Sequence, residues 1–205
     1  MSLVFIFSSF AAVFWFVMFS PWTSGRIGFW FMMPAATAFL VLAAVAADRK
    51  KLREVFKFET KFIFIGLVSA VFLYMVFFVG KFVAGFILPF ANSQIESIYS
   101  VKSQSDAVRI GLLLFFWIGP AEEIFWRGFI QRRLSEKFNP EVGYVLALAV
   151  YTAIHIWSFN FMLVTASLVC GVVWGFLYYR YKSIWPGLIS HAVWDVLIFV
   201  LFPVV

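Results

Sequence analysis

Five acidic and histidine side chains lie in stretches of sequence that are otherwise apolar enough to cross a membrane. They are two adjacent glutamates, two histidines and an aspartate: Glu122, Glu123, His155, His191 and Asp195. Both histidines of the chain are in this set, whereas the other seven of the ten acids fall in or beside predicted connections. A charge at the bilayer centre costs at least ~2.5–3.5 kcal/mol on insertion scales. These five residues are therefore the first candidates for a functional site.

Spacing along the helices pairs several of these side chains. Residues four apart share a helix face, which pairs Glu123 with Arg127 and His191 with Asp195. Glu122 is rotated by about 100° from Glu123 around the helix, and no charged residue follows it four positions on. We expect Arg127 to neutralise Glu123 and to leave Glu122 free to titrate. The same Glu123–Arg127 pair could equally be a structural ion pair.

Depth in the membrane suggests a common site. At ~1.5 Å per residue, four side chains from three helices fall in the middle band of a hydrocarbon core ~30 Å thick: Glu122, His155, His191 and Asp195. Amide hydrolysis needs a general base, a water and a donor aimed at the developing oxyanion. Glu122 as base, His155 sharing the water and His191 as donor would fill these roles. Nucleophilic catalysis is poorly supported, because no serine has a G-x-S-x-G setting and Cys170 has no basic neighbour.

Composition identifies the class of protein. Hydrophobic residues make up 64% of the 205, and charged residues make up 13%, about half of the usual share in soluble domains. A soluble protein of this size could not enclose 29 Phe and 9 Trp. These values exclude a disordered chain, a soluble enzyme and a nucleic-acid module. The net charge of +6 fits Lys and Arg at membrane boundaries, and no nucleic-acid partner is expected.

Seven apolar stretches of transmembrane length form one integral membrane domain, residues 1–205. They cover about 3–19, 27–47, 61–80, 107–133, 142–157, 161–179 and 184–205. The predicted fold is all-α, a polytopic membrane helix bundle. Gly119-Pro120 should break or kink the fourth span, and a break there or a re-entrant segment after Lys81 would make the count eight. The polar stretch 91–106 is predicted to be an exposed loop, and Trp15, near a span end, to anchor its helix at the interface.

The distribution of basic residues predicts the orientation. With the N-terminus in the cytoplasm, alternating spans put 12 of the 16 Lys and Arg on the cytoplasmic side, as the positive-inside rule requires. The chain is therefore predicted to be a multi-pass protein of the cell membrane (plasma or inner membrane). Its partners would be the lipid bilayer and a peptide or protein substrate at the membrane.

Three motifs occur in order along the second half of the chain. They are Glu122-Glu123-x-x-x-Arg127, an aromatic-x-x-x-His that ends at His155, and His191-x-x-x-Asp195. Together they resemble the CPBP family, which comprises type II CAAX-prenyl endopeptidases and Abi-like bacteriocin-processing or self-immunity proteins. The stretch AEEIFWRGFIQ, 121–131, looks like the family's first motif with its flanks. The resemblance covers about 107–200, the predicted catalytic core, and the first spans carry none.

The resemblance implies a glutamic-type intramembrane protease that needs no cofactor or metal. Glu122 and His155 would activate a water, and His191 with the residue four later would stabilise the oxyanion. Asp195 stands where prenyl endopeptidases typically have Asn, and an ionised Asp cannot donate a hydrogen bond. It could instead orient His191. Zinc bound through His191 and Asp195 is the minority alternative, although no H-E-x-x-H is present.

The leading function is an intramembrane endopeptidase that hydrolyses a peptide bond of a membrane-associated protein or peptide. Its substrate could be a prenylated CAAX protein, a leader peptide or a C-terminal sorting signal, and no residue selects among them. The alternative is a non-enzymatic bacteriocin-immunity or membrane scaffold protein with a vestigial site. A proton-coupled carrier is disfavoured because the sequence has no inverted repeat.

Overall fold

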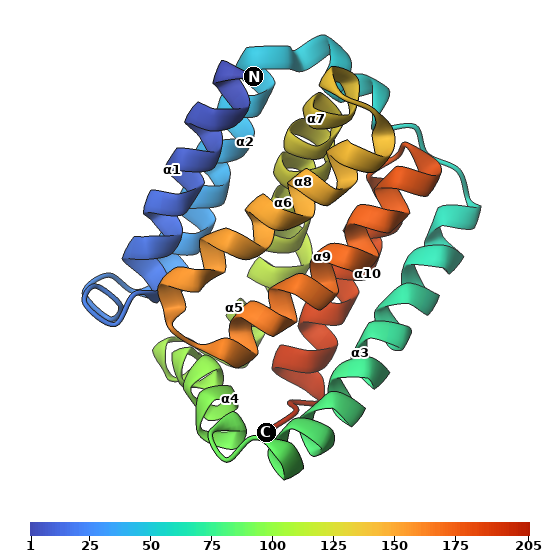
Figure 1. The fold of residues 1–205 in the computed structure, drawn as a ribbon. Coiled ribbons are helices and arrows are strands. Elements are labelled where there is room, and N and C mark those ends of the chain that lie inside the picture. The colour runs from blue at the N-terminus through green and yellow to red at the C-terminus, as the bar shows by residue number, and fades with distance from the viewer.

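The computed structural model describes residues 1–205 as a bundle of helices without strands (Figure 1). Three long helices open the chain, and a short helix with a 3₁₀ turn follows: α1 (Ser2–Phe19), α2 (Phe29–Glu54), α3 (Lys61–Ile87), α4 (Ala91–Tyr99) and η1 (Ser100–Gln104). The prediction of an all-α bundle is confirmed. α3 extends past Gly80, where the third span was expected to end.

The second half begins with one uninterrupted helical run that changes its winding four times. It comprises α5 (Ala107–Leu113), the π-helical η2 (Leu114–Ile118), α6 (Gly119–Glu123), the π-helical η3 (Ile124–Gln131) and α7 (Arg132–Lys137). The remaining elements are α8 (Pro140–Ala153), the 3₁₀ turn η4 (Ile154–Ser158), α9 (Phe161–Tyr181), α10 (Trp185–Val196) and the π-helical η5 (Leu197–Leu201).

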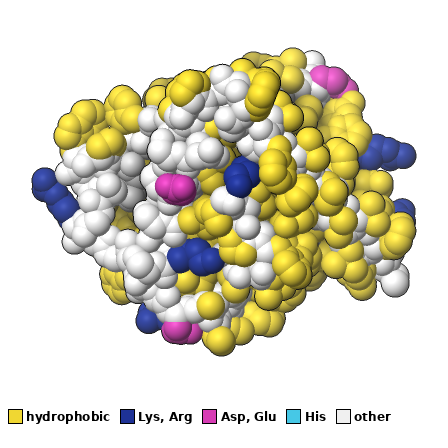
Figure 2. All heavy atoms as spheres, turned by 90° about the horizontal axis from the view of Figure 1, so that it is seen from below, with side chains coloured by type: hydrophobic (Ala, Val, Ile, Leu, Met, Phe, Trp, Pro, Cys, Tyr) yellow, Lys and Arg dark blue, Asp and Glu magenta, His cyan; other side chains and the backbone are white.

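Five helices are long and apolar enough to cross a membrane: Ser2–Phe19, Phe29–Glu54, Lys61–Ile87, Pro140–Ser158 and Phe161–Tyr181. The other two predicted spans are helical as well, but they consist of shorter segments, so seven spans remains a prediction. Large aromatic side chains point outward from the long helices, as Phe64 and Phe86 of α3 do. On the face seen in Figure 2, charged side chains are few and stand apart among hydrophobic ones. The chain is a multi-pass membrane protein.

The expected break at Gly119-Pro120 is absent, because the helix widens instead. The Gly119 N–H donates to the carbonyl of Leu114, five residues back, and this π-helical turn makes room for a proline that lacks a donor. Gly119 is also a point of close approach, since an added Cβ would lie 3.2 Å from the backbone of Ala192 in α10. Winding of this kind is common at functional sites.

The stretch 91–106 is not the loop that was expected, because most of it is helical in α4 and η1. Its polar side chains bind the start of α9. The Gln94 side chain accepts from the Met162 N–H at 3.1 Å, and the Asn160 amide donates to the Gln94 carbonyl at 2.8 Å. The helix therefore closes one end of the bundle, at the bottom of Figure 1.

The centre of the bundle is formed by α6 and η3, behind α8 and α9 in Figure 1. Every residue of 125–131 is buried, including Phe125, Trp126 and Phe129. α10 packs beside α6 and along α3. Within the fourth predicted span, α6 and η3 thus have protein on all sides. In such surroundings, ionisable side chains can pair with one another away from lipid.

Candidate active site

α6 directs its two glutamates into different surroundings. Glu123 is fully buried, and its Oε1 lies 3.2 Å from Nη1 of Arg127, so the predicted ion pair is present. The same oxygen accepts a hydrogen bond from Nδ1 of His191 at 3.0 Å. Glu122 is 6% exposed and has no ion-pair partner. Its only side-chain contact with a donor is a long hydrogen bond of 3.4 Å from the Tyr151 hydroxyl.

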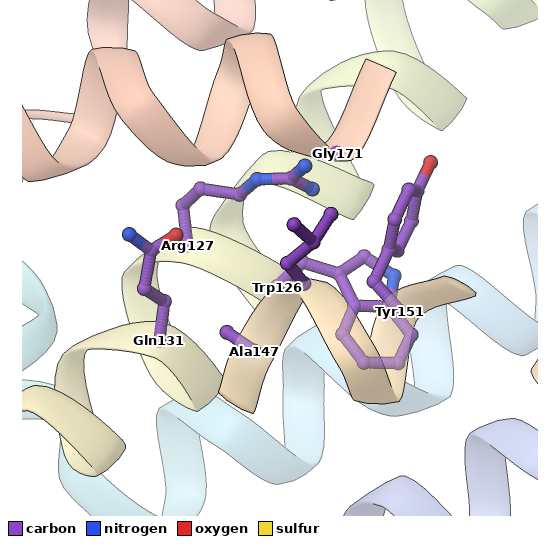
Figure 3. Close-up of a pocket in the computed structure, with 7 residues that line it drawn as sticks. Trp126, Arg127, Gln131, Ala147, Tyr151 and Gly171 are labelled. Atoms are coloured by element: carbon purple, nitrogen blue, oxygen red, sulfur yellow. The ribbon is translucent and has the colours of Figure 1, made fainter. Parts of the chain in front are cut away.

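The Arg127 guanidinium lies between aromatic rings as well as beside Glu123. It is 4.7 Å from the centroid of Tyr151 and 5.7 Å from that of Trp174, distances at which a cation is attracted to a ring face. Figure 3 shows it beside a cavity of about 10 Å³ that Trp126 and Gln131 also line, space for about one water. Arg127 is thus enclosed by the bundle, as a buried counter-ion of Glu123 must be.

His191 is held on α10 by a stack and by a carboxylate. Its ring lies against the Trp174 ring with centroids 3.6 Å apart and planes 16° from parallel. Trp174 in turn donates to the Ser190 hydroxyl at 3.1 Å, which donates to Ser69 of α3 at 3.0 Å. Three helices, α3, α9 and α10, therefore fix this ring.

Asp195 is near His191 but does not orient it in the way that the spacing suggested. Its Oδ2 lies 3.6 Å from Nε2 of His191, which is beyond a hydrogen bond. The hydrogen bond that sets the ring comes from the other nitrogen, Nδ1, to Glu123. Glu123, assigned only to a supporting ion pair, therefore also orients His191.

His155 is held by two hydrogen bonds on the 3₁₀ turn η4. Its Nδ1 lies 2.8 Å from the carbonyl of Tyr151, and its Nε2 lies 3.1 Å from the indole nitrogen of Trp15 in α1. A carbonyl only accepts and an indole N–H only donates. His155 is therefore neutral, with its proton on Nδ1 and its lone pair on Nε2.

Short contacts connect the predicted residues. Tyr151 joins two of them, since its hydroxyl contacts Glu122 and its carbonyl binds His155. Glu123 joins Arg127 to His191. The contacts thus form two sets, one of Glu122, Tyr151 and His155 and one of Glu123, Arg127 and His191, and the two glutamates are adjacent on α6.

Several members of this cluster carry no signal in the sequence. Trp15 was expected to anchor α1 at the membrane interface, but it is 1% exposed and contacts His155. Trp174 and Ser69 are likewise uncharged residues in apolar spans. Neither spacing nor charge could identify them, because their role depends on which helices are neighbours.

A metal site would need at least three His, Cys, Asp or Glu side chains to converge, and the chain holds no such group.

Comparison with known protein families finds a match in the second half of the chain. The family model described as type II CAAX prenyl endopeptidase Rce1-like matches residues 104–197. That segment contains every predicted site residue, whereas Trp15 and Ser69 lie outside it. No curated protein and no solved structure matches the chain with significance.

Proposed function

Through residues 104–197 the chain belongs to the CAAX protease family, and we propose that it is a glutamic-type intramembrane endopeptidase in which Glu122 and His155 activate a water. The family gives the coarse activity, that of a CAAX-type endopeptidase acting at the lipid bilayer. The roles of individual side chains, the metal independence and the substrate are our proposals.

The different pairing of the two adjacent glutamates carries the proposal. Glu123 is held by Arg127 and His191 through its Oε1, so this carboxylate is already engaged by two partners. Glu122 is buried without a cation and has one long hydrogen bond. A carboxylate in such a site is able to accept a proton from water, which is the task of a general base.

The reaction then needs few steps. Glu122 takes one proton from a water whose other contact is His155, and the water oxygen attacks the scissile carbonyl. His191 and Asp195 stabilise the oxyanion, and Glu122 returns the proton to the leaving amine as the C–N bond breaks. Glu123 and Arg127 support this site by fixing His191, which keeps the donor aimed before the charge develops.

Protein contacts at His155 favour a reaction in which this imidazole binds no metal. Nδ1 of His191 binds Glu123, and both nitrogens of His155 are bound by Tyr151 and Trp15. A metal at His155 would have to displace one of these partners, whereas Nε2 of His191 has no hydrogen bond. We also propose a cell-membrane location with a cytoplasmic N-terminus, from the distribution of Lys and Arg.

Peptide cleavage by purified protein tests the function. The protein in lipid vesicles is incubated with three fluorogenic peptides: a farnesylated CAAX peptide, a leader peptide and a membrane-anchored C-terminal peptide. Wild type should cleave at least one of them, and Glu122→Gln should lower kcat/KM by about 10²–10⁴, the range for a general base.

The matched control is Glu96→Gln, since Glu96 is an exposed glutamate of α4. It should cleave the same peptide at the rate of the wild type. Equal cleavage by wild type and Glu122→Gln would refute the role of Glu122, and cleavage of none of the peptides would refute the proposed substrate classes.

A further inference from the structure

α1 contributes one polar contact to the cluster, the hydrogen bond from Trp15 to His155. The indole nitrogen lies 3.1 Å from Nε2, and both side chains are buried. The two rings meet edge to face, with centroids 5.9 Å apart. This contact joins a helix outside the family-matched segment to a residue of the proposed site.

The contact occupies the atom that the reaction needs. Nδ1 of His155 is committed to the carbonyl of Tyr151 at 2.8 Å, so Nε2 is the nitrogen left for water. A neutral imidazole has one acceptor lone pair, and the Trp15 N–H is directed at it. While this hydrogen bond lasts, His155 cannot accept one from the attacking water.

We propose that Trp15 is a gating residue of this peptidase: its indole N–H holds Nε2 of His155 at rest and leaves when substrate and water enter. The proposal rests on the proposed function for its link to the reaction. It assigns α1, which carries no family motif, a role in admitting water to the site.

The packing of α1 allows such a displacement. Four of its 18 residues are buried, Val4, Ala11, Trp15 and Met18, and the rest are exposed or partly buried. Within α1, Trp15 is the residue whose side chain hydrogen-bonds to another helix. A small shift or rotation of α1 would therefore break this one hydrogen bond. The other contacts of the helix are apolar side-chain contacts, which such a shift would only slide past one another.

Chemical modification tests the contact without any substrate. Diethyl pyrocarbonate acylates the free lone pair of a neutral imidazole, and the chain has two histidines, so mass spectrometry resolves each of them. In the full-length protein in vesicles, His155 should react slowly. Trp15→Phe keeps an aromatic ring and removes the N–H, and it should speed the modification of His155 about two- to tenfold, as expected for the loss of one buried hydrogen bond.

Two further variants distinguish the effect of losing the indole N–H from the effect of losing side-chain volume. Trp126→Phe is the matched control, because Trp126 is also buried, contacts Trp15, and has an indole N–H without a partner. It should leave the modification of His155 unchanged. Trp15→3-benzothienylalanine keeps the shape of the indole and lacks the N–H, so it should act as Trp15→Phe does even where the Phe variant folds poorly.

Activity measures the consequence. Both Trp15 variants should raise kcat/KM toward the peptide that wild type cleaves, since opening no longer breaks a hydrogen bond. The proposal is overturned if neither variant speeds His155 modification beyond Trp126→Phe, or if both speed it and lower kcat/KM, which would make Trp15 a positioning residue. If the Trp15 variants speed the modification of His155 but neither wild type nor any variant cleaves a peptide, the Trp15–His155 contact stands and the proposed function is rejected.

Discussion

Oε1 of Glu123 lies 3.0 Å from Nδ1 of His191 and 3.2 Å from Nη1 of Arg127. One carboxylate oxygen thus joins the first motif of the chain to the third. Its neighbour Glu122 makes no such contact. Adjacent residues of the same type therefore have separate tasks, because they point to different sides of one helix.

Glutamine substitutions should separate these tasks. Glu122→Gln removes the proposed base and keeps the shape, so turnover should stop while the thermal unfolding temperature stays unchanged. Glu123→Gln should lower both turnover and the unfolding temperature. Arg127 becomes an unpaired buried charge at a cost of ~3–5 kcal/mol, and the charged acceptor of His191 becomes a neutral amide oxygen. Peptide cleavage and unfolding in detergent micelles measure the two effects. The opposite pattern, a stable dead Glu123→Gln and an unstable Glu122→Gln, would reverse the assignment.

Gly187 should be required for the position of Glu123. A Cβ added there would lie 2.7 Å from Oε2 of Glu123, so Gly187→Ala must displace that carboxylate from His191. Misplacement of about 1 Å can cost about a hundredfold in rate, and we expect kcat to fall about tenfold to a hundredfold.

The control for this substitution is Gly80→Ala in α3. A Cβ there meets nothing within 4 Å, and alanine in a helix interior is favoured over glycine by ~0.5–1 kcal/mol. Gly80→Ala should therefore keep full activity. Full activity of Gly187→Ala as well would show that the Glu123–His191 contact is dispensable.

Local properties of the sequence predicted the helices well, and relations between helices poorly. Hydropathy placed both ends of α1 and α9 within two residues, whereas α8 ends four residues before the predicted limit of its span. α1, however, is apolar on every side, so nothing in its periodicity distinguishes the face that packs inward from the face toward lipid. For this reason Trp15 could not be matched with His155 from the sequence. The pairing of Glu123 with Arg127 was predictable because both belong to one helix.

The winding around Pro120 shows a second limit. Proline signals a disturbed helix, but whether the chain breaks or widens depends on what packs against it. Here the backbone of Ala192 approaches Gly119 closely, and the run stays helical through π-turns.

At one end of the bundle, an ionic cluster should make stability depend on pH. Glu136 binds Lys51 and Arg132, each at 2.9 Å. Burial raises the pKa of Glu136, but the hydrogen bonds from Lys51 and Arg132 outweigh this and hold the pKa below its ordinary 4.5. A lowered pKa gives stability that is present above pH 4.5 and lost as the pH falls through the folded pKa.

Glu136→Gln should therefore flatten the loss of stability on acidification below pH 4.5, and at neutral pH it should cost about 0.2–1 kcal/mol, as for other exposed ion pairs. Thermal unfolding across pH measures both effects. Glu54→Gln is the control, because Glu54 is exposed and forms no ion pair. Equal pH profiles for the wild type and Glu136→Gln would exclude this contribution.

Removal of metal should leave the reaction intact. After dialysis against EDTA and 1,10-phenanthroline, kcat/KM should stay unchanged, since general-base hydrolysis by Glu122 uses no Lewis acid. The same treatment of a known zinc protease shows that the chelators work. Activity that is lost and then restored by zinc would instead make His191 and Asp195 metal ligands.

Asp195 allows the sharpest test of the oxyanion site. Glu123 already binds Nδ1 of His191, and Asp195 lies 3.6 Å from Nε2, so Asp195 is not needed to orient the ring. Its proposed task is at the oxyanion, where an amide can donate as well as a protonated acid. Asp195→Asn should keep appreciable activity, whereas Asp195→Ala should lose about a hundredfold or more, since one oxyanion donor is worth ~2.7–4 kcal/mol. Cleavage of the same peptide by both variants, with helical content checked by circular dichroism, decides the matter. If Asn were as inactive as Ala, the negative charge itself would be essential, and Asp195 would act on the charge of His191 rather than as a donor.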